Sequence, residues 1–308
     1  MFRDHLETKV AQWIKPWNGR SEPDVLFVGA PLSKTSISHS GASLTPQAVR
    51  EIFGVVSTYT IDHDIDLAEE LTACDAGDAV VHATDLARSR EGIRDAVAAV
   101  VAAAPEAMPV VIGGDHSITA PSFEAVQAAV NGPVGLIQLD AHMDLRNLDD
   151  GGPTNGTPVR QLIEAGVLSG PHVVQIGLHA FANAKPYRAY AQALGVTQVT
   201  AREVAHEGID PLIALALEVA GKGTEAIYVT IDMDVLDQAY APGVPAMVPG
   251  GMTSWQLFDA VFALGRDPRV KAFDIVEVDP SQDTRRATVR VAAHAILNFL
   301  TGYTVRSR

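Results

Sequence analysis

The chain has 308 residues, of which 47% are hydrophobic and 19% are charged, and its formal net charge at pH 7 is −14. This composition is typical of a globular protein, and the acidic balance argues against nucleic acid and anionic membranes as partners. Cys74 is the single cysteine, which excludes an intramolecular disulfide, and the N-terminus lacks the apolar core of a signal peptide. We therefore expect a cytoplasmic protein that acts on a small molecule.

Short apolar runs alternate with longer amphipathic runs along the whole sequence. Strands are predicted at 25–30, 108–114, 134–140, 172–179, 196–200, 226–232 and 272–278. Helices are predicted near 45–54, 91–103, 120–130, 157–167, 184–194, 210–221, 253–265 and 286–302. This alternation predicts an α/β fold in which helices cover both faces of a parallel sheet. We expect one domain over residues 1–308, with residues 1–20 as an N-terminal extension that packs on the body or on a neighbouring subunit.

Polar clusters follow three of these strands, in the stretches GGDHS (113–117), DAHMD (140–144) and DMD (232–234). A single Asp after a strand is usually a helix cap, and we interpret Asp115 and Ser117 as structural residues that fix the turn around His116. In open α/β sheets, ligands bind beyond the carboxyl ends of the strands, where these clusters fall.

The remaining acidic and imidazole side chains of the clusters are too many for structural roles alone. Four carboxylates brought that close together would repel one another strongly unless a cation compensated them. Oxygen-rich ligation with two imidazoles suits Mn²⁺ better than a structural zinc ion, and six ligands suit two cations that share carboxylates. The predicted ligands are His116, Asp140, His142, Asp144, Asp232 and Asp234.

The same stretches resemble the signature blocks of the ureohydrolase superfamily, which holds arginases, agmatinases and formimidoylglutamases. The matching blocks are GGDHS, DAHMDLR and IDMDVLDQAYAPGVPAMVPGGMT, and the resemblance extends from FVGAPLS (27–33) to the C-terminal stretch that begins DIVEVDPSQDTRR (274–286). The resemblance implies a three-layer α/β/α sandwich around a mostly parallel, eight-stranded sheet, as in arginase. It also implies a homo-oligomer, since relatives form trimers and hexamers.

The resemblance further implies roles for the individual residues. One Mn²⁺ would be held by His116, Asp140, Asp144 and Asp232, and a second by Asp140, His142, Asp232 and Asp234, so that each subunit holds two. Glu277 matches the family's acid that orients a guanidinium or amidinium group, for which a carboxylate is the natural partner. Asp144 and Glu277 are therefore the predicted catalytic residues.

Two stretches favour the formimidoylglutamase branch. Asn155, in PTNGTPVRQL, stands where arginases and agmatinases carry a histidine that shuttles a proton, and asparagine cannot transfer a proton at neutral pH. Arg146, at the end of DAHMDLR, provides a charged fork for a carboxylate. Arg160 could provide a second one, and Asn183 matches an Asn in the formimidoylglutamase pattern. We thus predict a carboxylate-bearing substrate bound by Arg146, Asn155, Arg160, Asn183 and Glu277.

The predicted reaction is the hydrolysis of N-formimidoyl-L-glutamate to L-glutamate and formamide, a step of histidine degradation. The sequence leaves alternatives open. The first is the release of urea from a guanidino compound, as by a guanidinobutyrase or an agmatinase, and the second is an inactive relative that binds metal. Arg146 and Arg160 could instead be structural, with Arg146 in a salt bridge to Asp149 or Asp150. The GGDHS form of the first block and the loop 33–43, which replaces a glycine-rich loop, also depart from the formimidoylglutamase pattern.

Overall fold

The computed structural model describes residues 4–306 and is built on one nine-stranded sheet, in which every pair of neighbouring strands is parallel. Across the sheet the strands are β1 (Lys15–Pro16), β5 (Ala73–Asp78), β2 (Val25–Ala30), β6 (Met108–Gly113), β11 (Val270–Val276), β10 (Ala226–Asp232), β7 (Val134–Leu139), β8 (Val173–Leu178) and β9 (Thr197–Thr200). Strands β2, β6, β7, β8 and β10 are buried along their whole length because helices cover both faces.

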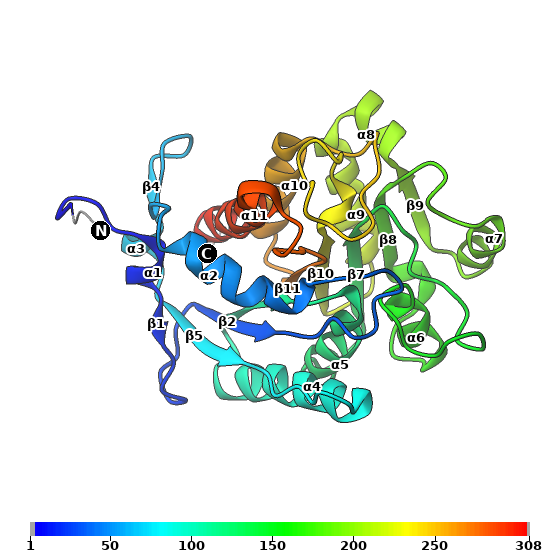
Figure 1. The fold of residues 1–308 in the computed structure, drawn as a ribbon, viewed down its shortest axis with the longest axis horizontal. Coiled ribbons are helices and arrows are strands. Elements are labelled where there is room, and N and C mark those ends of the chain that lie inside the picture. Colours follow the sequence, from blue (N-terminus) through cyan, green and yellow to red (C-terminus); the bar gives the residue numbers. More distant parts are fainter. Residues whose placement is uncertain (1–3, 307–308) are drawn as a thin grey trace.

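The helices form two layers, seen on either side of the strands in Figure 1. One layer packs its apolar side chains into the larger core and consists of α2 (Thr45–Phe53), α8 (Ala201–Glu207), α9 (Ile209–Ala220), α10 (Ser254–Arg266) and α11 (Ala287–Thr304). The other layer contains α4 (Leu86–Ala103), α5 (Thr119–Ala129), α6 (Pro158–Glu164) and α7 (Lys185–Ala193). The predicted α/β sandwich is confirmed.

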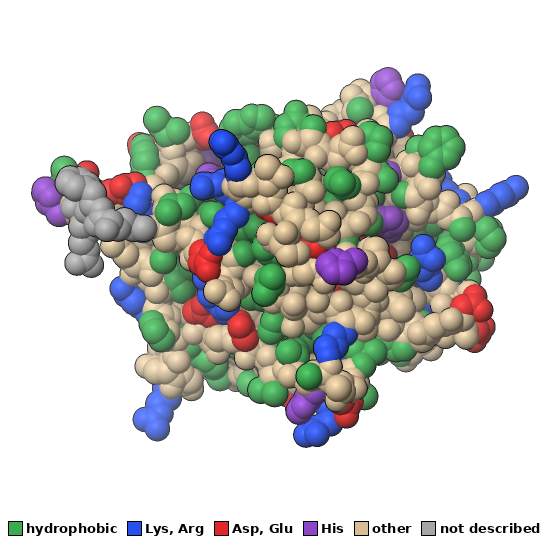
Figure 2. Space-filling view, in the orientation of Figure 1, with side chains coloured by type: hydrophobic (Ala, Val, Ile, Leu, Met, Phe, Trp, Pro, Cys, Tyr) green, Lys and Arg blue, Asp and Glu red, His purple; other side chains and the backbone are tan. Residues whose placement is uncertain are grey.

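The short elements lie at the periphery. Helices α1 (Val10–Trp13) and α3 (Leu67–Glu70) flank a two-stranded antiparallel hairpin, β3 (Tyr59–Thr60) and β4 (Ile65–Asp66), which projects from the body in Figure 1. Val10 and Trp13 are buried, and β1 pairs with β5, so the chain from Lys9 onward is part of the fold. On the face drawn in Figure 2, acidic, basic and hydrophobic side chains are interspersed.

The structure corrects the predicted number of strands. The sheet has nine strands, because β1 is added at its edge. Strand β5 was not predicted from its sequence, since ACDAGD carries two carboxylates and a glycine and has no apolar run. Helix α8, which a capping box of Thr200 and Glu203 begins, was likewise not predicted. No helix of residues 4–306 combines the length and the apolar character needed to cross a membrane.

Candidate metal centre and substrate pocket

The three polar clusters meet at the carboxyl ends of β6, β7 and β10, in the middle of the sheet. Strand β11 lies between β6 and β10, and β7 pairs with the other side of β10. A 3-10 turn follows β6 at His116–Ile118 and another follows β10 at Met233–Val235. The parallel order of the strands therefore brings together side chains that are more than 110 residues apart in the sequence.

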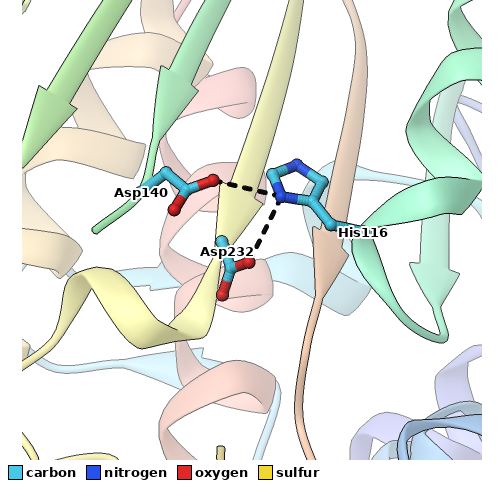
Figure 3. Close-up of side chains that lie close together, drawn as sticks. All are labelled: His116, Asp140 and Asp232. Carbon is cyan, nitrogen blue, oxygen red and sulfur yellow. Dashed lines mark ion pairs between the residues drawn. The ribbon is translucent and has the colours of Figure 1, made fainter. Parts of the chain in front are cut away.

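His116 lies at the centre of the first group of ligands. Its Nδ1 atom is 2.7 Å from Asp144 Oδ2, 3.1 Å from Asp140 Oδ2 and 3.2 Å from Asp232 Oδ2. Figure 3 shows the imidazole facing the carboxylates of Asp140 and Asp232, which come from separate strands. All four side chains are at least 95% buried, so water does not screen their charges.

His142 lies at the centre of the second group. Its Nδ1 atom is 2.9 Å from Asp234 Oδ2 and 3.6 Å from Asp140 Oδ1. Among residues 4–306, Asp140 is the residue that belongs to both groups, with one oxygen facing each imidazole. The six residues predicted to bind metal are all brought together.

The donor set fits a divalent cation, as the surroundings of His116 show. Thr230 Oγ1 donates to Asp274 Oδ1 at 2.5 Å, so the hydroxyl oxygen accepts from His116 Nε2 at 2.9 Å. This leaves Nδ1 as the nitrogen that faces the carboxylates, and no hydrogen bond of acceptable geometry reaches it. A lone pair facing three carboxylate oxygens is repulsive unless a cation lies between them.

The pKa values of the two imidazoles also show that the site favours positive charge. Burial alone would lower the pKa of His116, but Asp144 and its neighbouring carboxylates outweigh burial and hold the pKa well above its usual value. Burial is likewise outweighed at His142, where Asp234 raises the pKa to about 12. The carboxylates thus favour positive charge at both imidazoles, and cations that bind there would compete with protons for the same nitrogen atoms.

Glu277 follows β11 and closes the pocket on the side of His116. Its Oε1 atom accepts from the backbone N–H of His116 at 2.8 Å and from Asn155 Nδ2 at 3.0 Å, whereas Oε2 is buried without a hydrogen-bond partner. Burial and the charge of Asp115 raise the pKa of Glu277 to about 8. Glu277 and Asp144 also adopt left-handed backbone conformations, with φ of 62° and 53°, which bulky residues hold only where the surrounding structure enforces them.

A cavity of about 250 Å³ lies next to these ligands. Among its lining residues are His142, Asp144, Asp232, Asp234, Glu277, Asn155, Arg146, Asn183, Tyr187, Ile37 and Ser38. Arg146 packs against Gly156, and no carboxylate of residues 4–306 lies within ion-pairing distance of its guanidinium, so the salt bridge to Asp149 or Asp150 is not formed. Within residues 4–306, the cavity is therefore lined by two groups without partners, the guanidinium of Arg146 and Oε2 of Glu277.

Arg160 and Asn183 do not present free polar groups to this cavity. The guanidinium of Arg160 pairs with Glu164, stacks on the ring of Tyr190 at 3.9 Å and is not part of the cavity lining. Asn183 lines the cavity, but its amide accepts from Met143 N at 2.8 Å and donates to Ala141 O at 2.9 Å. Asn183 thus holds the DAHMD loop in place.

The loop 33–43 forms one wall of the pocket. Thr35 donates from its backbone N–H and its hydroxyl to Asp115, which also accepts from Ser117, as expected for structural residues. Ile37 N donates to Asn155 Oδ1 at 3.1 Å. Sequence reasoning did not find Ile37, Ser38 or Tyr187, since a loop residue or a single tyrosine carries no signal of a pocket until the loop is placed.

The fold and the donor set define a class of protein: an α/β/α sandwich with carboxylates and imidazoles gathered for divalent cations at the carboxyl ends of its strands. Residues 23–302 match the arginase family, and the chain belongs to this family. The predicted resemblance and the predicted class of hydrolase are confirmed.

Individual relatives resemble this chain in sequence and in structure over nearly its full length. A formimidoylglutamase from Halalkalibacterium halodurans is 46% identical, over 99% of this chain and 95% of the relative. The crystal structure of formimidoylglutamase from Bacillus subtilis superposes with a TM-score of 0.96 at 38% identity, covering 100% of this chain and 95% of that one. A formiminoglutamase from Trypanosoma cruzi, solved with Mn²⁺, has a TM-score of 0.89 at 26% identity, covering 98% of this chain and 100% of that one.

Proposed function

We propose that the protein is a manganese-dependent hydrolase that cleaves N-formimidoyl-L-glutamate to L-glutamate and formamide, and that a single domain carries this activity. The observation that carries the proposal is the pairing of two free groups in one cavity. Among residues 4–306, Glu277 Oε2 is a buried acceptor without a partner, and Arg146 is a cation without a carboxylate partner. A formimidoyl group and a carboxylate on one small molecule would satisfy both groups.

The two groups of ligands support a pair of Mn²⁺ ions. His116 and His142 each face at least two carboxylate oxygens, and Asp140 is shared. The ligands would be His116, Asp140, Asp144 and Asp232 for one ion and Asp140, His142, Asp232 and Asp234 for the other. When bound, the cations lower the pKa of water so that a nucleophile is available at neutral pH.

The residues of the chain bind and orient the substrate. Glu277 ionises when the cationic amidinium binds beside it, accepts from the amidinium N–H groups through Oε2, and is itself held by His116 N and Asn155. Arg146 binds a substrate carboxylate at the mouth of the cavity. Asn155 and Asn183 position Glu277 and the DAHMD loop, and the geometry offers no substrate role for Arg160.

Asp144 is the residue that transfers a proton to the leaving group. Burial and the charge of Asp140 raise the pKa of Asp144 to about 6 in the metal-free protein, and the proposed role rests on the position of Asp144 beside the substrate. Cleavage breaks the bond between the formimidoyl carbon and the α-nitrogen of glutamate, and this nitrogen must gain a proton as it leaves. Asp144 lines the cavity, whereas Asn155 cannot supply a proton.

Product identity tests the proposal. The protein is loaded with Mn²⁺ and given formimidoylglutamate, guanidinobutyrate, agmatine or arginine, and formamide and urea are measured. Formamide and glutamate from the first compound alone are expected. Urea from a guanidino compound would replace the proposed substrate, and the absence of any product from all four would favour a metal-binding relative without activity.

Two further predictions from the sequence have no test in the geometry of one chain. The homo-oligomer and the cytoplasmic location stay predictions, which the mass of the native protein in solution and fractionation of cells would check.

A further inference from the structure

A row of three glutamines crosses the sheet beside the metal centre. Gln138 on β7, Gln175 on β8 and Gln198 on β9 are register partners, so their side chains lie on the same face, beneath α5 and α6. Gln138 and Gln175 are fully buried and Gln198 is partly buried. Three amides in a row on adjacent strands, of which β7 and β8 are inner strands and β9 is the edge strand, are unusual, because apolar side chains would fill this space without a need for partners.

Hydrogen bonds join the amides head to tail. Gln198 Nε2 donates to Gln175 Oε1 at 2.7 Å, and Gln175 Nε2 donates to Gln138 Oε1 at 2.7 Å. Gln138 Nε2 in turn donates to Asp140 Oδ2 at 2.5 Å and reaches Asp144 Oδ2 at 3.3 Å. The row therefore ends on two of the predicted metal ligands.

A backbone carbonyl fixes the direction of the row. Gln175 Nε2 also donates to Met143 O at 2.5 Å, and a carbonyl oxygen can only accept. This contact keeps the Gln175 NH₂ group toward Gln138, so Gln138 must present its oxygen to Gln175 and its NH₂ group to the carboxylates. If the amide of Gln138 turned over, its oxygen would face Asp140 and Asp144 and repel both.

The row and the backbone of the DAHMD loop bind different oxygens of Asp140. Asp140 Oδ1 accepts from His142 N at 2.5 Å, while Oδ2 accepts from Gln138. Both oxygens of the shared carboxylate are thus oriented by neutral donors before any cation binds, and aligned amide dipoles strengthen such donors. Donors of this kind hold a ligand in its binding geometry without competing for the cation through charge.

We propose that Gln138 is a positioning residue for Asp140 and Asp144, and that Gln175 acts through it by fixing the direction in which its amide points. The proposal rests on the proposed metal centre and adds to it the residues that set its affinity. Gln175 contacts no carboxylate, so any effect of Gln175 on metal binding has to pass through Gln138 or the Met143 carbonyl.

The test measures Mn²⁺ binding to the metal-free protein by titration calorimetry, and thermal unfolding of the same samples. Q138M and Q175M keep the side-chain length and remove the amide. We expect the dissociation constant for Mn²⁺ to rise in each variant by roughly tenfold to a hundredfold, the usual effect of losing a hydrogen bond to a metal ligand. Q127M is the matched control, because Gln127 also makes two hydrogen bonds, near the start of β7 and away from the site.

The double variant Q138M/Q175M separates positioning from general loosening. If Gln175 acts through Gln138, the double variant binds Mn²⁺ no more weakly than Q138M alone. A purely structural role would lower the melting temperature of the metal-free protein and leave the Mn²⁺ affinity of the folded protein unchanged, and this result would overturn the proposal. If Q175M does not fold, Q138N tests the positioning role of Gln138 instead. Its shorter side chain keeps the amide but cannot reach Asp140, so Mn²⁺ binding should still weaken.

Results for the wild-type protein distinguish a failure of the proposed substrate from a failure of the proposed positioning role. A wild-type protein that binds Mn²⁺ but leaves formimidoylglutamate intact would contradict the proposed substrate, and the variants would still test the glutamine row. A wild-type protein that binds no Mn²⁺ would overturn the metal centre and the positioning role together.

Discussion

Arg146 is the residue on which the choice of substrate depends. It lines the cavity without a carboxylate partner, and the loss of a charged hydrogen bond to a substrate is worth about 1.5–3 kcal/mol. We expect Arg146→Met to raise KM for formimidoylglutamate by roughly tenfold to a hundredfold and to change kcat little, because Arg146 does not touch the reacting carbon. Steady-state kinetics measure both constants. Arg160→Met is the control, and an equal rise of KM in this variant would contradict the assignment.

Glu277 makes the stability of the metal-free protein depend on pH. Its folded-state pKa of about 8, raised by burial and by Asp115, lies above the ordinary value of a glutamate. Folded protein therefore binds this proton more tightly than unfolded protein does, and the stability that the proton confers is present below the ordinary pKa and is lost as pH rises toward 8. Glu277→Gln keeps the shape but carries no ionisable proton.

We expect the difference in stability between the metal-free wild type and metal-free Glu277→Gln to grow as the pH rises. Relative to the wild type, Glu277→Gln should gain stability between pH 5 and 8, by at least about 1 kcal/mol, since one pKa unit corresponds to 1.4 kcal/mol. Melting temperatures of both proteins across this range measure the gap, and a gap that does not change with pH would contradict the raised pKa. With metal bound, the same variant should hydrolyse formimidoylglutamate at a small fraction of the wild-type rate.

Residues of the site differ in how far the sequence predicts them. The ligands from Asp140 to Asp144 and from Asp232 to Asp234 could be predicted because acidic and imidazole side chains cluster where two predicted parallel strands end. The hydrogen bonds from His116 to Thr230 and from Thr230 to Asp274 could not, because they join β10, β11 and the turn after β6, and the sequence does not state the order of these strands. Arg160 is different: Glu164 lies four residues later on the same helix, and this spacing alone indicates the pair that occupies Arg160.

At the scale of elements, α10 and α11 pack closely through two glycines. A Cβ atom on Gly302 would lie 2.1 Å from the carbonyl oxygen of Phe262, and one on Gly265 would lie 2.1 Å from that of Phe299. Each helix thus presents a glycine to the backbone of the other. Neither position can accept a methyl group unless the two helices move apart.

Gly302→Ala should therefore lower the free energy of unfolding by about 1–3 kcal/mol, the usual cost of overpacking. Activity below the melting transition should stay unchanged, since neither helix supplies a residue to the cavity. Thermal unfolding and the formamide assay measure the two properties. Gly151→Ala is the control, because a Cβ atom there would meet nothing within 4 Å, and an equal loss of stability in both variants would contradict this account.

The elements themselves were predictable where the apolar pattern was strong. The inner strands are continuous runs of Val, Ile and Leu, and the predicted and observed bounds of β2 coincide. At the edge the pattern fails, because β5 has only one buried residue and β1 is two residues long. An edge strand is defined by its neighbour's hydrogen bonds rather than by its own hydrophobicity.

At the scale of the molecule, metal should stabilise the fold. A ligand that binds only the folded state adds about 2.7 kcal/mol when its concentration is a hundred times its dissociation constant. The His and Asp ligands come from three strands, so the site does not exist in the unfolded chain. We expect a chelator to lower the melting temperature and added Mn²⁺ to restore it. Equal melting temperatures with and without Mn²⁺ would contradict the metal centre, and Asp232→Ala, which lacks one of the proposed ligands, should show a much weaker response to Mn²⁺.

The place of β11 in the sheet has a consequence for synthesis of the protein. The ribosome completes β6 and β10 long before β11, yet β11 lies between them and pairs with both. Until residue 276 has left the exit tunnel, the nascent chain carries two unpaired inner edges, and such edges invite association with other chains. Holding chaperones would therefore matter most for chains that still lack the final tenth of their length, and early termination in this region would leave two half-sheets.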